Sequence, residues 1–282
     1  MQIQVLKEMF QREIDKTYSK EEILSFFHLL CESYLKKSRV ELALVPNLQL
    51  KPEQETLFLS ALDQLKRDVP IQYIIGHVEF MDLIFEVNEN VLIPRPETEE
   101  LISWIIESSS KKNENRILDI GTGSGCIPIV LQKNLPNSLI ETIDVSEKAL
   151  EVAQRNASAQ KVNVKFMHQD ILRLKNLDPV YDIIVSNPPY VRESEKNHMR
   201  NNVLKYEPDI ALYVSDDDPL IFYKHIAKLA LSGLKKNGNL YFEINQYLGK
   251  ELWQILNKMG FTKIEIKKDL YGVDRMIRAV KI

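Results

Sequence analysis

Beyond about residue 96, short apolar segments alternate with amphipathic segments of helical length, and this order most constrains the fold. Apolar runs typical of buried strands occupy 116–120, 139–144, 162–167, 181–186, 238–244, 261–267 and 275–281, and segments with helical periodicity occupy 97–108, 127–133, 146–158, 219–234 and 249–259. This alternation predicts an α/β fold with a seven-stranded, largely parallel sheet that is covered by helices on both faces. The last two strands have no helix between them, so one of them should run antiparallel.

The first 75 residues have a different, helical pattern. Apolar residues recur at helical spacing from Ile3 onward, Ser19 and Glu22 have the spacing of a capping box, and Pro52 stands at a typical first helical position. This stretch contains no catalytic constellation. We therefore expect residues 1–75 to form a small helical domain that recognises a substrate.

Residues 76–95 connect the two patterns. Segments 78–80 and 83–87 are rich in β-forming residues, and only two residues, Met-Asp, separate them. This spacing predicts a β-hairpin linker. The α/β domain should then span residues 96–282.

Composition and charge exclude several classes of protein. The chain has 282 residues, of which 44% are apolar and 27% charged, and its net charge of −3 argues against nucleic-acid binding through bulk charge. The two cysteines and five histidines show no metal-ligand spacing, so we expect no metal site. The charged N-terminus lacks a signal-peptide core, and no apolar run approaches the roughly 18 residues of a membrane span, so we expect a cytoplasmic protein without membrane contact.

Residues 119–125 read Asp-Ile-Gly-Thr-Gly-Ser-Gly and lie between the first predicted strand and its helix. Glycines at alternate positions let the main chain turn sharply and let a ligand lie against it, and the amides of the following helix can face that ligand. Asp144 ends the second strand, where an acid can accept hydrogen bonds from two ribose hydroxyls. A glycine-rich turn with an incidental acid is the alternative. The order strand, loop, helix, strand and acid favours a ligand site.

With these features the chain resembles the class I S-adenosylmethionine-dependent methyltransferases, which have a Rossmann-like domain. The resemblance implies S-adenosylmethionine as the cofactor and S-adenosylhomocysteine as the product. It also implies that Asp119 reaches towards the methionine amino group, that Asp144 holds the ribose, and that Asp170 and Ile171 border the adenine. The loop residues that would pack beside the methionine part are Gly121, Thr122, Gly123, Ser124 and Gly125.

A second motif, Ser186-Asn-Pro-Pro-Tyr190, ends the fourth predicted strand. Ligands of open α/β sheets bind at the carboxyl ends of the strands, so this motif should lie where a methyl acceptor would bind. Pro188 and Pro189 have no backbone N–H but keep their carbonyls, Asn187 adds a side-chain carbonyl, and Tyr190 adds a flat face. Such a turn suits a planar –NH2 group, whose two hydrogens the Asn187 side chain and the Pro188 carbonyl would bind. The alternative is an ordinary turn that ends a strand.

This motif resembles the signature of methyltransferases that modify adenine, cytosine or glutamine, and alone it does not separate them. With the segments 72–80, 92–99, 206–208 and 274–275, the whole chain looks like the release factor glutamine methyltransferases of the HemK or PrmC type. The resemblance implies N5-methylation of the glutamine in the Gly-Gly-Gln loop of class I peptide chain release factors. It also implies that residues 187–190 hold the glutamine amide, with Asn187 bordering the cofactor as well, and that the N-terminal helices help to grip the protein substrate.

Other activities remain as alternatives. A glutamine methyltransferase for a ribosomal protein could use the same pair of domains. An N6-adenine methyltransferase would need a basic surface for phosphates, which the near-neutral N-terminal segment does not indicate, so we expect no direct nucleic-acid partner. A cofactor-binding module without transfer would be a non-enzymatic alternative, although both motifs are intact.

Three further features have simpler interpretations. Pro96 with Glu97 and Glu99 is typical of a helix start, and only the family resemblance suggests that this stretch also lines the acceptor entrance. Glu207, followed by proline, is interpreted as part of an ordinary turn. Cys126 at a helix start is expected to be a small buried packing residue rather than a reactive thiol.

Overall fold

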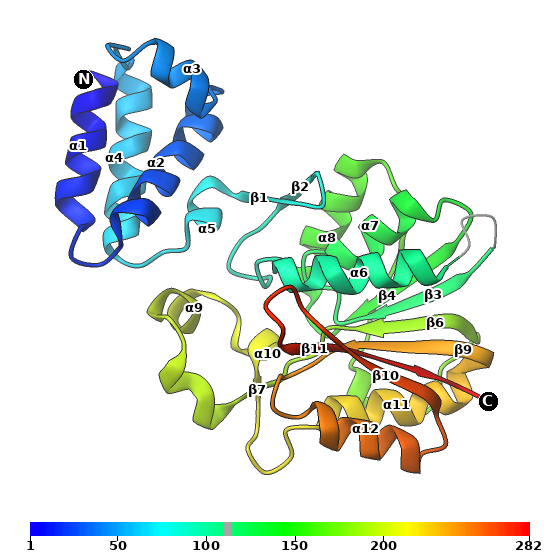
Figure 1. Cartoon of the computed structure of the whole chain (residues 1–282). Coiled ribbons are helices and arrows are strands. Elements are labelled where there is room, and N and C mark those ends of the chain that lie inside the picture. Colours follow the sequence, from blue (N-terminus) through cyan, green and yellow to red (C-terminus); the bar gives the residue numbers. More distant parts are fainter. Residues whose placement is uncertain (110–113) are drawn as a thin grey trace. The chain divides into compact units, whose positions relative to one another are not determined.

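The computed structural model describes residues 1–109 and 114–282, apart from the side chain of His198, and these residues form two compact units (Figure 1). The first unit contains Met1–Gly76 and Arg200–Tyr206, and the second contains His77–Met199 and Glu207–Ile282. The boundary expected near residue 75 coincides with this division. Two expectations need correction, because segment 200–206 belongs to the first unit and the hairpin belongs to the second.

The first unit is built from helices around one apolar core. Its elements are α1 (Ile3–Ile14), α2 (Lys20–Leu35), α3 (Arg39–Leu44), α4 (Pro52–Lys66), α5 (Ile71–Ile75) and α9 (Asn201–Tyr206). The rings of Phe10, Phe27 and Phe58 lie 5.5 to 6.4 Å apart at its centre. The capping box predicted from Ser19 and Glu22 is confirmed at the start of α2.

Segment 200–206 joins this unit through polar contacts. The Tyr206 hydroxyl donates to the Arg67 carbonyl at 2.7 Å, and Arg200 pairs with Glu22 at 2.8 Å. These partners are distant in the sequence, so local periodicity gave no sign of the contact.

Within the described residues, seven strands of the second unit form one sheet, as predicted. They are β3 (Arg116–Ile120), β4 (Leu139–Asp144), β5 (Lys165–His168), β6 (Tyr181–Ser186), β9 (Leu234–Glu243), β10 (Thr262–Lys268) and β11 (Asp274–Val280). Their order is β10-β11-β9-β6-β3-β4-β5. β11 is antiparallel to both of its neighbours, which confirms the antiparallel strand expected at the end of the chain. The third strand is shorter than expected, because 162–164 precede the pairing with β4.

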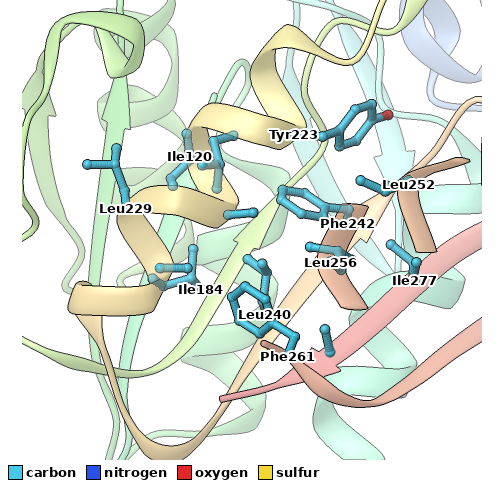
Figure 2. Packing of buried hydrophobic residues seen from close by; sticks show 14 of the residues in the cluster. Ile120, Ile184, Tyr223, Leu229, Leu240, Phe242, Leu252, Leu256, Phe261 and Ile277 are labelled. Atoms are coloured by element: carbon cyan, nitrogen blue, oxygen red, sulfur yellow. The ribbon is translucent and has the colours of Figure 1, made fainter. Parts of the chain in front are cut away.

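Helices cover both faces of the sheet (Figure 1). One face is covered by α6 (Pro96–Ser108), α7 (Cys126–Asn134) and α8 (Glu147–Gln160), and the other by α11 (Ile221–Gly233) and α12 (Gly249–Lys258). Successive strand residues alternate between these layers: Ile183 packs with α6 and α7, whereas Ile184 packs with α11. Figure 2 shows the second layer, where Phe242 and Leu240 of β9 pack with Leu252 and Leu256 of α12.

The short elements lie in the connections of the second unit. They are β1 (His77–Phe80), β2 (Leu83–Glu86), the 3-10 turns η1 (Ile171–Arg173) and η2 (Glu193–His198), β7 (Val191–Arg192), α10 (Asp209–Leu212) and β8 (Tyr213–Val214). No helix in the described part of the chain is both long and apolar enough to cross a membrane.

The hairpin of β1 and β2 is anchored to the second unit, which explains why it is not a separate linker. Asn156 of α8 accepts a hydrogen bond from the Glu86 amide at 2.7 Å and donates to the Glu86 carbonyl at 3.0 Å. Its side chain also donates to the Ser124 carbonyl at 2.9 Å. Phe80 and Phe85 are buried against α6 and α7. The hairpin therefore supports the loop that follows β3.

Candidate active site

The glycine loop and the SNPPY turn leave neighbouring strands at the same level of the sheet. β3 and β6 pair in parallel with Ile120 opposite Ser186, and the Ser186 hydroxyl donates to the Ile120 carbonyl at 2.7 Å. The next residues are Gly121 and Asn187. A Cβ atom on Gly121 would come within 3.9 Å of the Asn187 main-chain carbonyl. The two motifs therefore lie side by side at the carboxyl edge, where the sequence predicted a site.

A cavity of about 290 Å³ opens between these motifs. Its lining includes most of the predicted site residues, namely Gly121, Thr122, Gly123, Ser124, Asp144, Asp170, Ile171, Asn187, Pro188 and Pro189. Gly125, Asp119 and Tyr190 do not line it. Gly125 instead precedes α7 as its N-cap residue, and Tyr190 faces a separate hollow.

The glycine loop has a conformation that needs glycine. Gly121, Gly123 and Gly125 have φ values of +81°, +52° and +83°, in the left-handed region that L side chains rarely adopt. A Cβ on Gly125 would also lie 3.0 Å from the Ala153 side chain. The loop is thus held against α8 with its main chain exposed to the cavity.

Asp144 braces this loop. Its carboxylate accepts hydrogen bonds from the Gly123 amide at 2.9 Å and from the Ser146 amide at 2.8 Å. Burial raises the pKa of Asp144, and the hydrogen bonds from Ser146 and Gly123 oppose this shift. Each carboxylate oxygen has two lone pairs, so the side chain can accept further bonds from a ligand in the cavity.

Asp119 is completely buried below the loop. Its Oδ2 accepts a hydrogen bond from the Thr142 hydroxyl at 2.7 Å, whereas its Oδ1 has no hydrogen-bond partner among the described residues. Burial raises the pKa of Asp119 to about 7, because the charged form is poorly solvated there. A cationic group close to Oδ1 would favour the charged form.

The Asn187 side chain is held through its amide nitrogen. Nδ2 donates to the Thr98 hydroxyl at 3.4 Å, and the Thr98 hydroxyl donates to Glu243 Oε2 at 2.6 Å. The Tyr190 hydroxyl donates to the other oxygen, Glu243 Oε1, at 3.0 Å. This chain fixes the orientation of the Asn187 amide and leaves its Oδ1 as an acceptor at the cavity.

Glu243 supports this arrangement, and the sequence analysis did not identify it. It ends β9, it is 1% exposed, and it accepts hydrogen bonds from Tyr190 and from Thr98, the residue that holds Asn187. Burial raises its pKa, and the hydrogen bonds from Thr98 and Tyr190 oppose that shift. The only signal in the sequence was an acid at the end of an apolar strand, and Thr98 lies 145 positions away.

Glu207 lies in the bend between α9 and α10, as the sequence indicated, and its side chain has a supporting role that the sequence did not indicate. Its buried carboxylate accepts hydrogen bonds from the Ile93 amide at 3.2 Å and from Arg95 at 2.6 Å. Arg95, Pro94 and Thr98 line the cavity. Glu207 therefore positions the stretch before α6 as one wall of the site. Pro96 also starts α6, as predicted.

Cys126 is buried, which confirms its interpretation as a packing residue. Burial raises the pKa of its thiol to about 12, so it carries no thiolate at neutral pH.

Comparison with known proteins connects this geometry to a family. Residues 9–76 match the PrmC N-terminal domain, and residues 100–206 match the family described as Methyltransferase small domain. The release factor glutamine methyltransferase of Flavobacterium psychrophilum is 50% identical over 282 residues, which covers 99% of each chain. The chain belongs to the release factor glutamine methyltransferase family. The family member of Bacteroides thetaiotaomicron is 39% identical and covers 95% of this chain and 96% of its own.

Solved structures support the fold of this family member. A methyltransferase from Pyrococcus furiosus has a TM-score of 0.52 at 16% identity and covers 82% of this chain and 99% of its own. The catalytic domain of hMettl16, solved with an RNA hairpin, has a TM-score of 0.55 at 18% identity and covers 82% of this chain and 83% of its own. At such identities these likenesses show a methyltransferase fold and nothing about the substrate.

Proposed function

We propose that this protein methylates N5 of the glutamine in the Gly-Gly-Gln motif of class I peptide chain release factors. The observation that carries the proposal is the likeness over 99% of both chains to a relative named for this activity, with the PrmC N-terminal domain included. The SNPPY turn alone would fit several planar amino groups. The family membership narrows these groups to glutamine.

The cavity fits S-adenosylmethionine. The buried, unpaired Oδ1 of Asp119 suits a nearby ammonium group, and the three glycines leave room for a ligand against the main chain. Asp144 would hold the ribose, and Asp170 and Ile171, which line the same cavity, would border the adenine. When bound, S-adenosylmethionine supplies a methyl group activated by its sulfonium charge, and it leaves as S-adenosylhomocysteine.

The acceptor turn would orient the glutamine amide. Asn187 Oδ1 and the Pro188 carbonyl would accept its two N–H groups, and no amide of Pro188 or Pro189 competes for them. Amide nitrogens are weak nucleophiles because their lone pair is delocalised. The turn therefore contributes alignment and stabilises the positive charge that develops on the nitrogen. The nitrogen loses one proton once it carries the methyl group.

The first unit would bind the protein substrate outside the reacting residue. Its match to the PrmC N-terminal domain supports this role. A dedicated unit is reasonable for an enzyme whose substrate is a folded protein, because the acceptor turn contacts only one side chain.

Transfer from labelled S-adenosylmethionine to a purified class I release factor tests the proposal. We expect label on the wild-type release factor and none on a variant whose Gly-Gly-Gln glutamine is replaced by alanine. A ribosomal protein and a DNA duplex serve as alternative substrates. If either of them is labelled and the release factor is not, the proposed substrate is wrong and the labelled molecule takes its place.

A further inference from the structure

The loop between β10 and β11 exposes two large apolar side chains. Leu270 is 88% exposed and Tyr271 is 84% exposed, the highest values among the large hydrophobic residues that the structure describes. The two side chains are neighbours in the chain, so they form one small contiguous apolar patch rather than scattered exposed residues.

This loop is braced from within. The Asp269 carboxylate, which is almost fully buried, accepts hydrogen bonds from the Tyr271 and Val273 amides, both at 3.0 Å, and from Arg275 Nε at 3.2 Å. Gly272, with φ +80°, completes the turn by donating to the Asp269 carbonyl at 2.9 Å. The exposed pair is thus presented by a defined turn.

Strand directions place the loop at the edge of the sheet where the site lies. β10 and β9 are both antiparallel to β11, so they run in the same direction, and β9 is parallel to β6. The loop after β10 therefore lies at the carboxyl edge with the SNPPY turn (Figure 1).

A second hollow, of about 410 Å³, is lined by a residue at the base of the loop and by part of the acceptor motif. Arg275, which binds Asp269 at the base of the loop, lines this hollow together with Tyr190 and Asn245. Asn245 also donates to the Tyr190 carbonyl at 3.0 Å, and the hollow has a further exposed aromatic residue, Tyr247. None of these residues lines the cofactor cavity.

We propose that Leu270 and Tyr271 form a docking contact for the folded protein that carries the acceptor glutamine. The inference rests on the proposed function, because it takes the occupant to be a release factor. It follows from continuity, because Arg275 joins the two features: it binds Asp269 at the base of the loop and lines the hollow that has Tyr190 in its wall. A folded substrate whose glutamine reaches the SNPPY turn would place its neighbouring surface along this edge of the sheet, where the loop also lies.

The test is the double variant Leu270→Ser/Tyr271→Ser, with Leu139→Ser as the matched control. Leu139 is 64% exposed at the start of β4, on the opposite edge of the sheet. For the double variant we expect KM for a release factor to rise about tenfold, as for the loss of one moderate interface contact. We expect kcat at saturation and the Kd for S-adenosylmethionine to stay at wild-type values, and the control to match wild type throughout.

Three results would overturn the proposal. One is an unchanged KM in the double variant, and another is an equal rise in the control. The third is a change in the oligomeric state of the enzyme alone, measured by light scattering, because the occupant would then be a second copy of this chain. If wild-type enzyme transfers no methyl group to a release factor, the proposed function itself fails, which is a separate and visible outcome.

Discussion

The loop after β3 and the turn after β6 lie side by side, yet they offer a ligand opposite chemistry. The loop contains three glycines with positive φ, and it presents main-chain amides at the start of α7. The turn contains two prolines, which lack backbone N–H groups, and it offers the side-chain oxygen of Asn187 and the main-chain carbonyl of Pro188 as acceptors. Two neighbouring strand ends can therefore divide a reaction between them, one holding the methyl donor and the other the nitrogen that accepts it.

The largest expected effect separates these two roles. Asn187→Ala removes an acceptor at the reacting nitrogen, so kcat should fall about 100-fold or more, by analogy with the loss of a single polar group that stabilises transition-state charge. The Kd for S-adenosylmethionine should stay close to that of wild type. Rapid-quench transfer assays and calorimetry measure the two quantities. If the variant chiefly loses cofactor affinity, Asn187 serves the cofactor and the division is wrong.

Asp144→Ala should have the opposite signature. It removes a carboxylate that braces Gly123 and would hold the ribose. Because the lost hydrogen bonds involve a charged group, we expect the Kd for S-adenosylmethionine to rise about 10-fold to 100-fold. Turnover at saturating cofactor should change much less. Asp182→Ala is a suitable control, because Asp182 near the start of β6 accepts a hydrogen bond from the Arg116 amide at the start of β3, at the opposite edge of the sheet from the site. Unchanged cofactor affinity in Asp144→Ala would contradict the ribose assignment.

Glu243→Gln should affect the turn through its supports. The glutamine amide offers one acceptor oxygen where the carboxylate offers two, so the hydroxyl of Thr98 or Tyr190 loses its acceptor and Asn187 is held less firmly. We expect kcat to fall about tenfold through poorer alignment, with KM and cofactor Kd unchanged. A purely structural role would instead lower the melting temperature and leave kcat of the folded fraction at the wild-type value.

The smallest expected effect is the dependence of stability and of cofactor affinity on pH, through Asp119. The folded pKa of Asp119 is raised to about 7, so the folded protein holds a proton that the unfolded chain has already lost above about pH 4. Stability without cofactor should therefore fall as pH rises from about 4 to 7. Affinity for the cationic cofactor should rise severalfold between pH 6 and 8, as Asp119 ionises. Calorimetric titrations across this range should show the rise in wild type and a flat profile in Asp119→Asn.

The sequence predicted strands most accurately where the local hydrophobic pattern agrees with the packing of the sheet. The strands at 116–120, 139–144 and 181–186 match residue for residue. They are short segments rich in Ile, Leu and Val that lie in the middle of the sheet, and each ends at a loop or an acid. The strand predicted at 162–167 was less exact, because β5 is an edge strand with one hydrogen-bonded neighbour.

The residues that support the site and the shortest elements could not be predicted, because they depend on contacts between residues that are distant in the sequence. Glu243 and Thr98 support the SNPPY turn and Glu207 supports the stretch before α6, but each resembles a common helix or strand end when seen alone. The two-residue strands β7 and β8 and the short helix α9 have too few positions to show periodicity. Sequence reasoning thus finds the groups that would touch ligands, and the fold is needed to find those that hold them.

The most direct test of the divided site is the double variant Asn187→Ala/Asp144→Ala, compared with both single variants. The quantity to measure is kcat/KM for the cofactor, with the release factor at a saturating concentration. If the turn acts on the acceptor and the loop on the cofactor, the loss in the double variant equals the product of the two single losses within about a factor of two. A loss no larger than that of the more damaging single variant would mean that both residues support one shared step, and it would contradict the account.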